Sequence, residues 1–137
     1  MTNDKKAFLS SDGGSRGNPG PSAGAAVLWD ENKKEIAREG VYCGRQTNNF
    51  AEYAGLICGL NLAFSHSVTD LEVILDSKLI AEQMNGNYKA KNPNIRPSFE
   101  KAKLLAGKFH SIKFRHVLRT KNKVADSIVN EVLDAHC

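Results

Sequence analysis

Four acidic residues lie where predicted strands and helices begin or end. They are Asp12, Glu52, Asp76 and Asp126. Strand ends and helix starts can converge on one edge of a sheet, and ligand sites form at such places. Four converging carboxylates could therefore make a metal site, although their separations along the chain do not by themselves identify one.

Each of these acids also has an ordinary structural explanation. Asn49 and Glu52 have the spacing of a helix capping box. Asp76 could be the N-cap of a following helix, and Asp126 would complement the dipole of the helix that it opens. Asp12 precedes two glycines and could form an Asx turn. The acids need their surroundings before they indicate a function.

The elements that must position the acids follow from apolar periodicity and turn residues. Strands are predicted at 7–12, 23–29, 35–43, 70–76 and 111–118, and helices from about Asn49, at 77–84, 98–107 and about 123–135. The run from Gly13 to Gly24 and residues 85–97 are predicted loops. A meander of three strands followed by α/β crossovers predicts an α/β fold, with a mixed five-stranded sheet and helices on both faces.

Length and composition suit one globular domain over residues 1–137, with a flexible N-terminus at 1–6. No apolar run approaches the ~20 residues of a membrane span, and the N-terminus lacks the pattern of a secretory signal. We therefore expect a cytoplasmic protein. Its three cysteines are expected to be reduced thiols, with a disulfide between Cys58 and Cys137 as the alternative.

Charge is distributed unevenly along the chain. The formal net charge is +4, and eleven of the 19 Lys and Arg residues but only four of the 15 acidic residues lie after Gly86. A basic half indicates an anionic partner, most often nucleic acid. The Gly-rich run after Asp12 is not a P-loop, because it lacks the Gly-Lys-Ser/Thr ending and leads into a strand.

The segments around the acids form an ordered set of motifs. They are DGGSRGNPGP from Asp12, TNNFAEY from Thr47, VILDSKL from Val73, and HVLR from His116 followed by Asn122 and Asp126. In order, spacing and predicted element, they resemble the ribonuclease H type 1 (ribonuclease HI) family. That family has D-G-[SG]-x-x-G-N-P-G, T-N-N-x-x-E, a strand ending D-S, and H-x-x-x-x-x-N-x-x-x-D. The resemblance covers about Phe8 to Asn130.

The resemblance implies an RNase H-like fold and an endoribonuclease that hydrolyses the RNA strand of RNA–DNA hybrids, leaving 3′-hydroxyl and 5′-phosphate ends. The four acids would hold two Mg²⁺ or Mn²⁺ ions, which prefer oxygen ligands, with Asp76 touching both. A standalone monomer is expected, without the basic protrusion of some members, since residues 85–97 are too short for it.

Other residues are assigned by the same resemblance. Asn18, Asn48 and Asn49 would contact sugars and base edges, because an amide can both donate to and accept from a 2′-hydroxyl. Further substrate-binding candidates are Gly13, Gly14 and, as a phosphate contact, Lys78. The group that assists proton transfer or product departure would be His116, within a predicted strand, or Arg119, in the loop that follows.

Two other functions remain open. One is a nucleic-acid-binding module of this fold with weak or no turnover, and the complete set of carboxylates argues against it. The other is a nuclease that also cleaves double-stranded RNA, which the Asn-rich loops do not exclude.

Overall fold

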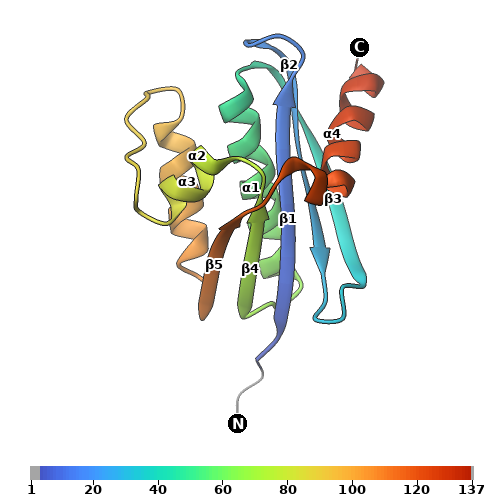
Figure 1. Cartoon of the computed structure of the whole chain (residues 1–137), viewed down its shortest axis with the longest axis vertical. Helices are drawn as coiled ribbons and strands as arrows, with labels where there is room; N and C mark the ends of the chain where they lie inside the picture. Colours follow the sequence, from blue (N-terminus) through green and yellow to red (C-terminus); the bar gives the residue numbers. More distant parts are fainter. Residues whose placement is uncertain (1–3, 137) are drawn as a thin grey trace.

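The computed structural model describes residues 4–136 and contains a single five-stranded sheet in the order β3-β2-β1-β4-β5 (Figure 1). The strands are β1 (Lys6–Ser15), β2 (Gly20–Trp29), β3 (Glu35–Gln46), β4 (Asp70–Leu75) and β5 (Ser111–His116). The helices are α1 (Asn48–Ser65), α2 (Lys78–Met84), α3 (Arg96–Ala106), the 3₁₀ turn η1 (Arg119–Lys121) and α4 (Lys123–His136).

The predicted mixed sheet is confirmed. Strands β1, β2 and β3 pair antiparallel, whereas β4 runs parallel to β1 and β5 parallel to β4. Residues 1–3, which belong to the expected flexible N-terminus, and Cys137, one half of the alternative disulfide, lie outside the described residues. Within residues 4–136, no helix is long and apolar enough to cross a membrane.

Helices cover both faces of the sheet and create two apolar cores. The larger core packs α1, α2 and α3 against one face, with Leu71, Val73 and Leu75 pointing into it from alternate positions of β4. The smaller core packs α4 against the other face, chiefly over β2. Because α4 covers only one side of that face, much of the surface of β4 and β5 there is left partly exposed (Figure 1).

The hairpin of β1 and β2 is longer than predicted. The loop expected from Gly13 onward was wrong at both ends, because the antiparallel ladder continues through Gly13↔Gly24 and Gly14↔Ala23 to Ser15↔Ser22. Only residues 16–19 form the turn. Asp12 therefore lies inside a strand that is still paired with β2 at this position.

Helix α1 packs unusually close to the sheet at positions where glycine, which has no side chain, allows the two backbones to approach. A Cβ at position 55 would lie 2.2 Å from the carbonyl oxygen of Asp12, and one at position 13 would lie 2.2 Å from the backbone of Ala51. Such distances are impossible for real Cβ atoms, so both positions require glycine. The contact brings the first turns of α1, including Glu52, against β1 at Asp12 and Gly13.

Gly55→Ala is expected to destabilise the protein by at least about 2 kcal/mol, because the methyl group forces backbone apart rather than a flexible side chain. Thermal unfolding would measure the loss. The matched control is Gly107→Ala at the end of α3, where a Cβ meets its nearest neighbours at 3.5 Å and φ is −65°. Equal melting temperatures for the two variants would contradict the close-approach argument.

Candidate active site

Strand register places Asp12 beside Asp76. The parallel pairing of β1 with β4 ends at Ser11↔Leu75. Asp12 directly follows Ser11, and Asp76 directly follows Leu75. Asp12 itself remains paired with Ala25 of β2. The Asx-turn explanation for Asp12 is therefore wrong, because the residue is held in a regular strand.

Glu52 and Asp126 approach from two helices. Glu52 is the fifth residue of α1, and the helix is capped by Thr47, whose Oγ1 accepts from the N–H of Phe50 at 3.2 Å. The capping box expected for Asn49 and Glu52 is thus wrong. Asp126 lies in the first turn of α4, as predicted.

Asp76 is not a helix cap either. The N-cap of α2 is Ser77, whose Oγ accepts from the N–H of Ile80 at 3.3 Å. A buried hydrogen bond near Asp76 comes instead from Asn122. This residue is 2% exposed, and its Nδ2 donates to the carbonyl oxygen of Ser11 at 2.8 Å. It ties the segment before α4 to β1 at Ser11, the residue before Asp12.

The acids gather around one cavity. Carboxylate oxygens of Asp12, Glu52 and Asp76 lie within 4.8 Å of one another. The same three residues, together with Asp126 and Arg119, line a cavity of about 440 Å³. Asp12 is only 5% exposed, so its carboxylate has little access to bulk water. The structure thus brings together all four carboxylates that the sequence singled out.

Burial and mutual repulsion make Asp12, Glu52 and Asp76 hard to ionise. Burial, and then the charge of Asp76, raises the pKa of Asp12 to about 8. Burial also raises the pKa of Glu52, with the charges of Asp12 and Asp76 adding to the effect. The pKa of Asp76 is raised by burial, against hydrogen bonding from Asn122 and the charge of Arg119. Clustered acids in this state favour a cation that offsets their charge.

The donor set fits divalent Mg²⁺ or Mn²⁺. All of the converging ligand atoms are carboxylate oxygens, which these hard ions prefer. The Oε2 atom of Glu52 is buried and has no hydrogen-bond partner among the described residues, although buried polar atoms are normally satisfied. A bound cation would supply that missing partner.

Of the two candidates for an assisting group, Arg119 lies at the cavity and His116 does not. Arg119 Nη2 is 3.1 Å from Asp126 Oδ1. His116 is the last residue of β5, is exposed, and pairs with Leu75. It shares its side of the strand with Phe114, which packs on the core of α1–α3, whereas Asp12 faces the opposite side of the sheet.

Some of the substrate-binding candidates lie at the cavity and others do not. Gly13, Gly14 and Asn48 line the cavity. Asn18 lies in the β1–β2 turn, and its Oδ1 accepts from the N–H of Asn48 at 3.1 Å, while Asn48 Oδ1 accepts from the N–H of Ser15 at 2.8 Å. These bonds connect the turn to the start of α1.

The remaining two candidates do not line the cavity. Asn49 and Lys78 are exposed first-turn residues of α1 and α2, respectively. Two residues that position the site were given no role from the sequence, namely Asn122 and Gly55. Asn122 was visible only as part of a motif. Gly55 could have been suspected from the Gly55–Gly59 pair, four residues apart in an apolar helix.

Comparison with known proteins places the chain among its relatives. The Reverse transcriptase-like family model matches residues 10–132. A bifunctional protein of Mycobacterium tuberculosis is 42% identical over 131 residues, which are 95% of this chain but 36% of that protein. A ribonuclease HI of Halobacterium salinarum is 39% identical over 123 residues, covering 90% of this chain and 62% of that protein. The chain therefore spans about a third of the length of the Mycobacterium relative.

Solved structures agree with the sequence matches. The N-terminal RNase H domain of the Mycobacterium tuberculosis protein has a TM-score of 0.94 at 41% identity, covering 96% of each chain. RNase H1 of Halobacterium salinarum has a TM-score of 0.92 at 37% identity, covering 95% of this chain and 98% of that one. LC11-RNase H1, solved with an RNA/DNA hybrid, has a TM-score of 0.88 at 37% identity and the same coverage. With its fold, its four gathered carboxylates and these relatives in agreement, the chain belongs to the ribonuclease H type 1 family.

Proposed function

We propose that this chain is a metal-dependent endoribonuclease that hydrolyses the RNA strand of RNA–DNA hybrids. The observation that carries the proposal is the cavity lined by Asp12, Glu52, Asp76 and Asp126. Further support comes from a relative with 37% identity that was solved in complex with an RNA/DNA hybrid. A binding module has no need of four buried or half-buried acids that repel one another.

The four carboxylates would hold two Mg²⁺ or Mn²⁺ ions, with Asp76 shared between them. Bound there, the ions would supply activation of the attacking water and stabilisation of the departing 3′ oxygen, and the products would carry 3′-hydroxyl and 5′-phosphate ends. The protein contributes a rigid ligand set, because Asp12 is fixed in a strand and Glu52 is held by the close crossing of α1. It also contributes partial exclusion of water, which strengthens electrostatic interactions within the cavity.

Substrate recognition is assigned to the asparagines beside the cavity. The side-chain oxygens of Asn18 and Asn48 already accept backbone N–H groups, so these residues would offer their NH₂ groups to a 2′-hydroxyl oxygen or to base acceptors. Asn49 is exposed next to Asn48. Lys78 would meet a phosphate from the start of α2, and the backbone at Gly13 and Gly14 would line the path of the RNA strand.

Arg119→Ala is expected to lower kcat by about a hundredfold, at the low end of what one electrostatic contact to a transition state contributes, whereas His116→Ala is expected to change it little. The reason is that Arg119 contacts Asp126 and lines the cavity, while His116 faces the other side of the sheet. Steady-state cleavage of a labelled hybrid would measure both. The assignment is reversed if the histidine variant carries the larger loss.

A direct test of the function uses the protein and an Asp76→Asn variant with labelled hybrid, double-stranded RNA, single-stranded RNA and duplex DNA. Each substrate is incubated with Mg²⁺, with Mn²⁺ and with chelator. We expect metal-dependent cleavage of the hybrid RNA strand by the unmodified protein alone. Absence of any RNA cleavage would contradict the enzyme proposal and favour a binding module. Equal cleavage of hybrid and double-stranded RNA would contradict the proposed specificity for hybrids.

A further inference from the structure

A second set of metal-binding side-chain types lies at the opposite end of the sheet from the four carboxylates. Asp4 directly precedes Lys5 and the start of β1, Asp70 is the first residue of β4, and His110 directly precedes β5. The carboxylate cluster, in contrast, lies where β4 and its pairing with β1 end. The proposed nuclease chemistry therefore makes no use of these three residues.

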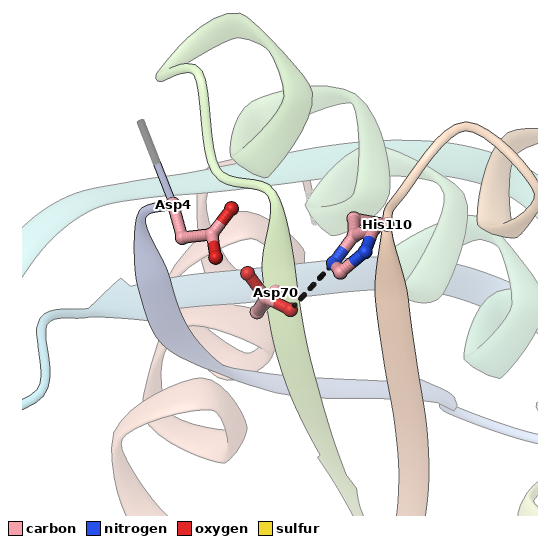
Figure 2. A group of neighbouring side chains, drawn as sticks. All are labelled: Asp4, Asp70 and His110. Atoms are coloured by element: carbon pink, nitrogen blue, oxygen red, sulfur yellow. Dashed lines mark hydrogen bonds and ion pairs between the residues drawn. The ribbon is translucent and has the colours of Figure 1, made fainter. Parts of the chain in front are cut away.

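The topology itself brings the three residues together. Strands β1, β4 and β5 are parallel neighbours and begin at the same edge of the sheet. Backbone bonds fix their starts, with the N–H of Asp70 donating to Lys5 at 3.1 Å and the N–H of His110 donating to Thr69 at 2.8 Å. Figure 2 shows the carboxylates of Asp4 and Asp70 and the ring of His110 gathered at these adjacent strand starts.

The spacing of the side chains suits a bound cation. One ligand atom from each of Asp4, Asp70 and His110 lies within 4.8 Å of the other two, and His110 Nδ1 is 3.3 Å from Asp70 Oδ1. Ligands bound to a tetrahedral Zn²⁺ through bonds of about 2.0–2.2 Å lie roughly 3.3–3.6 Å apart. The pair of His110 and Asp70 is thus already at coordination distance, and Asp4 needs only a small approach.

The surroundings hold the carboxylate of Asp70 in an anionic, oriented state. Thr69 Oγ1 donates to Asp70 Oδ2 at 2.8 Å, as an outer-shell partner of a metal ligand does. Without a bound ion, hydrogen bonds from Thr69 and then from His110 lower the pKa of Asp70, with smaller contributions from the charges of His110 and Lys6. The ammonium of Lys5 is directed elsewhere, because its Nζ donates to the carbonyl oxygen of His66 at 2.7 Å. The two carboxylates together match the charge of a divalent ion.

We propose that Asp4, Asp70 and His110 form a binding site for a borderline divalent ion such as Zn²⁺, which joins the start of β1 to the starts of β4 and β5. An imidazole nitrogen with carboxylate oxygens is a donor set of zinc sites, whereas Mg²⁺ favours the all-oxygen cluster at the other end of the sheet. The two sites therefore differ in the ion that they select. The site is independent of the proposed nuclease activity.

The test is a Zn²⁺ titration of the whole chain in excess Mg²⁺, followed by amide shifts in ¹H–¹⁵N spectra and by calorimetry. We expect saturable shifts at the amides of Lys5, Thr69 and Ser111. Asp4→Asn and His110→Gln should each weaken this binding at least about tenfold, since even an outer-shell change costs about that much. Both side chains are exposed, so the variants should fold, and their melting in chelator checks this.

The matched control is His66→Gln, a histidine at the same end of the molecule but outside the cluster. It should bind Zn²⁺ as the unmodified chain does. Zinc shifts confined to the surroundings of Asp12 and Glu52 would overturn the proposal, as would unchanged binding in His110→Gln. Because the readout is residue-resolved, failure at this site leaves the test of the nuclease unaffected, and the reverse also holds.

Discussion

Asp12→Asn is expected to abolish most hybrid cleavage while making the metal-free protein more stable. Asp12 is 5% exposed and shares its cavity with three other acids. Loss of its negative charge removes a metal ligand, and we expect kcat to fall by at least about a hundredfold to a thousandfold, the range for removing one electrostatic contact to a transition state. The measurement is single-turnover cleavage of a labelled hybrid in Mg²⁺.

The stability of the same variant should move in the opposite direction. In chelator no cation offsets the cluster, and burial together with the charge of Asp76 makes ionised Asp12 costly. A neutral amide of the same shape avoids that cost, so the melting temperature in chelator should rise by several degrees at pH 8. In Mg²⁺ the advantage should shrink, because the unmodified protein gains stability from its bound ions.

Glu100→Gln is the matched control for Asp12→Asn. It makes the same acid-to-amide change on the surface of α3, where Glu100 pairs with Arg96 and is 61% exposed. Exposed pairs contribute little, so activity and melting temperature should stay close to those of the unmodified chain. A variant at Asp12 that lost stability in chelator would show that its carboxylate is a structural group and would contradict the site proposed here.

Much of this arrangement could be predicted from the sequence because it depends on local patterns. The alternation of Leu71, Val73 and Leu75 predicts β4, and the apolar stripe of α1 predicts the longest helix. The order of elements then leaves few topologies, and the observed sheet is the expected one. The four acids were recognised through the motifs around them, since their spacing alone is compatible with caps and turns.

What the sequence could not show depends on contacts between distant segments. Gly13 and Gly14 favour a turn locally, yet they lie in a ladder because β2 supplies partners and α1 needs the space that Gly13 leaves. Thr47 rather than Asn49 caps α1, a difference of two residues that no local pattern decides. The choice between His116 and Arg119 depends on which side of β5 faces the cavity, and that depends on strand register.

Stability in chelator is expected to fall as pH rises from about 5 to 8. The pKa of Asp12 is about 8 in the folded protein and near 3.9 when unfolded, so the folded state holds the proton more tightly. The contribution of Asp12 to the free energy of unfolding is fully present below its pKa in the unfolded chain and is lost as pH rises through its pKa in the folded protein. Glu52 and Asp76 shift in the same direction.

The size of the effect should be a few kcal/mol, because each pKa unit corresponds to about 1.4 kcal/mol. Thermal or denaturant unfolding in chelator, at several pH values across this range, would measure it. Asp70 has a lowered pKa, so its contribution is lost only at more acidic pH and leaves this window undisturbed. The Asp12→Asn variant should show a flatter profile, and parallel profiles for the two proteins would exclude Asp12 as the titrating group.

Mg²⁺ should counteract this fall in stability with rising pH. Metal ligands must be deprotonated before they bind, so the stabilisation by Mg²⁺ grows as pH rises through the pKa of Asp12. The melting temperature in Mg²⁺ should therefore exceed that in chelator by a larger margin at pH 8 than at pH 6. A margin that is independent of pH would mean that the ion binds without displacing protons from the cluster. The carboxylates that destabilise the metal-free fold would then not be the ligands. A margin that grows with pH would instead show that the carboxylates that destabilise the metal-free fold are the ones that release protons when they bind the ion.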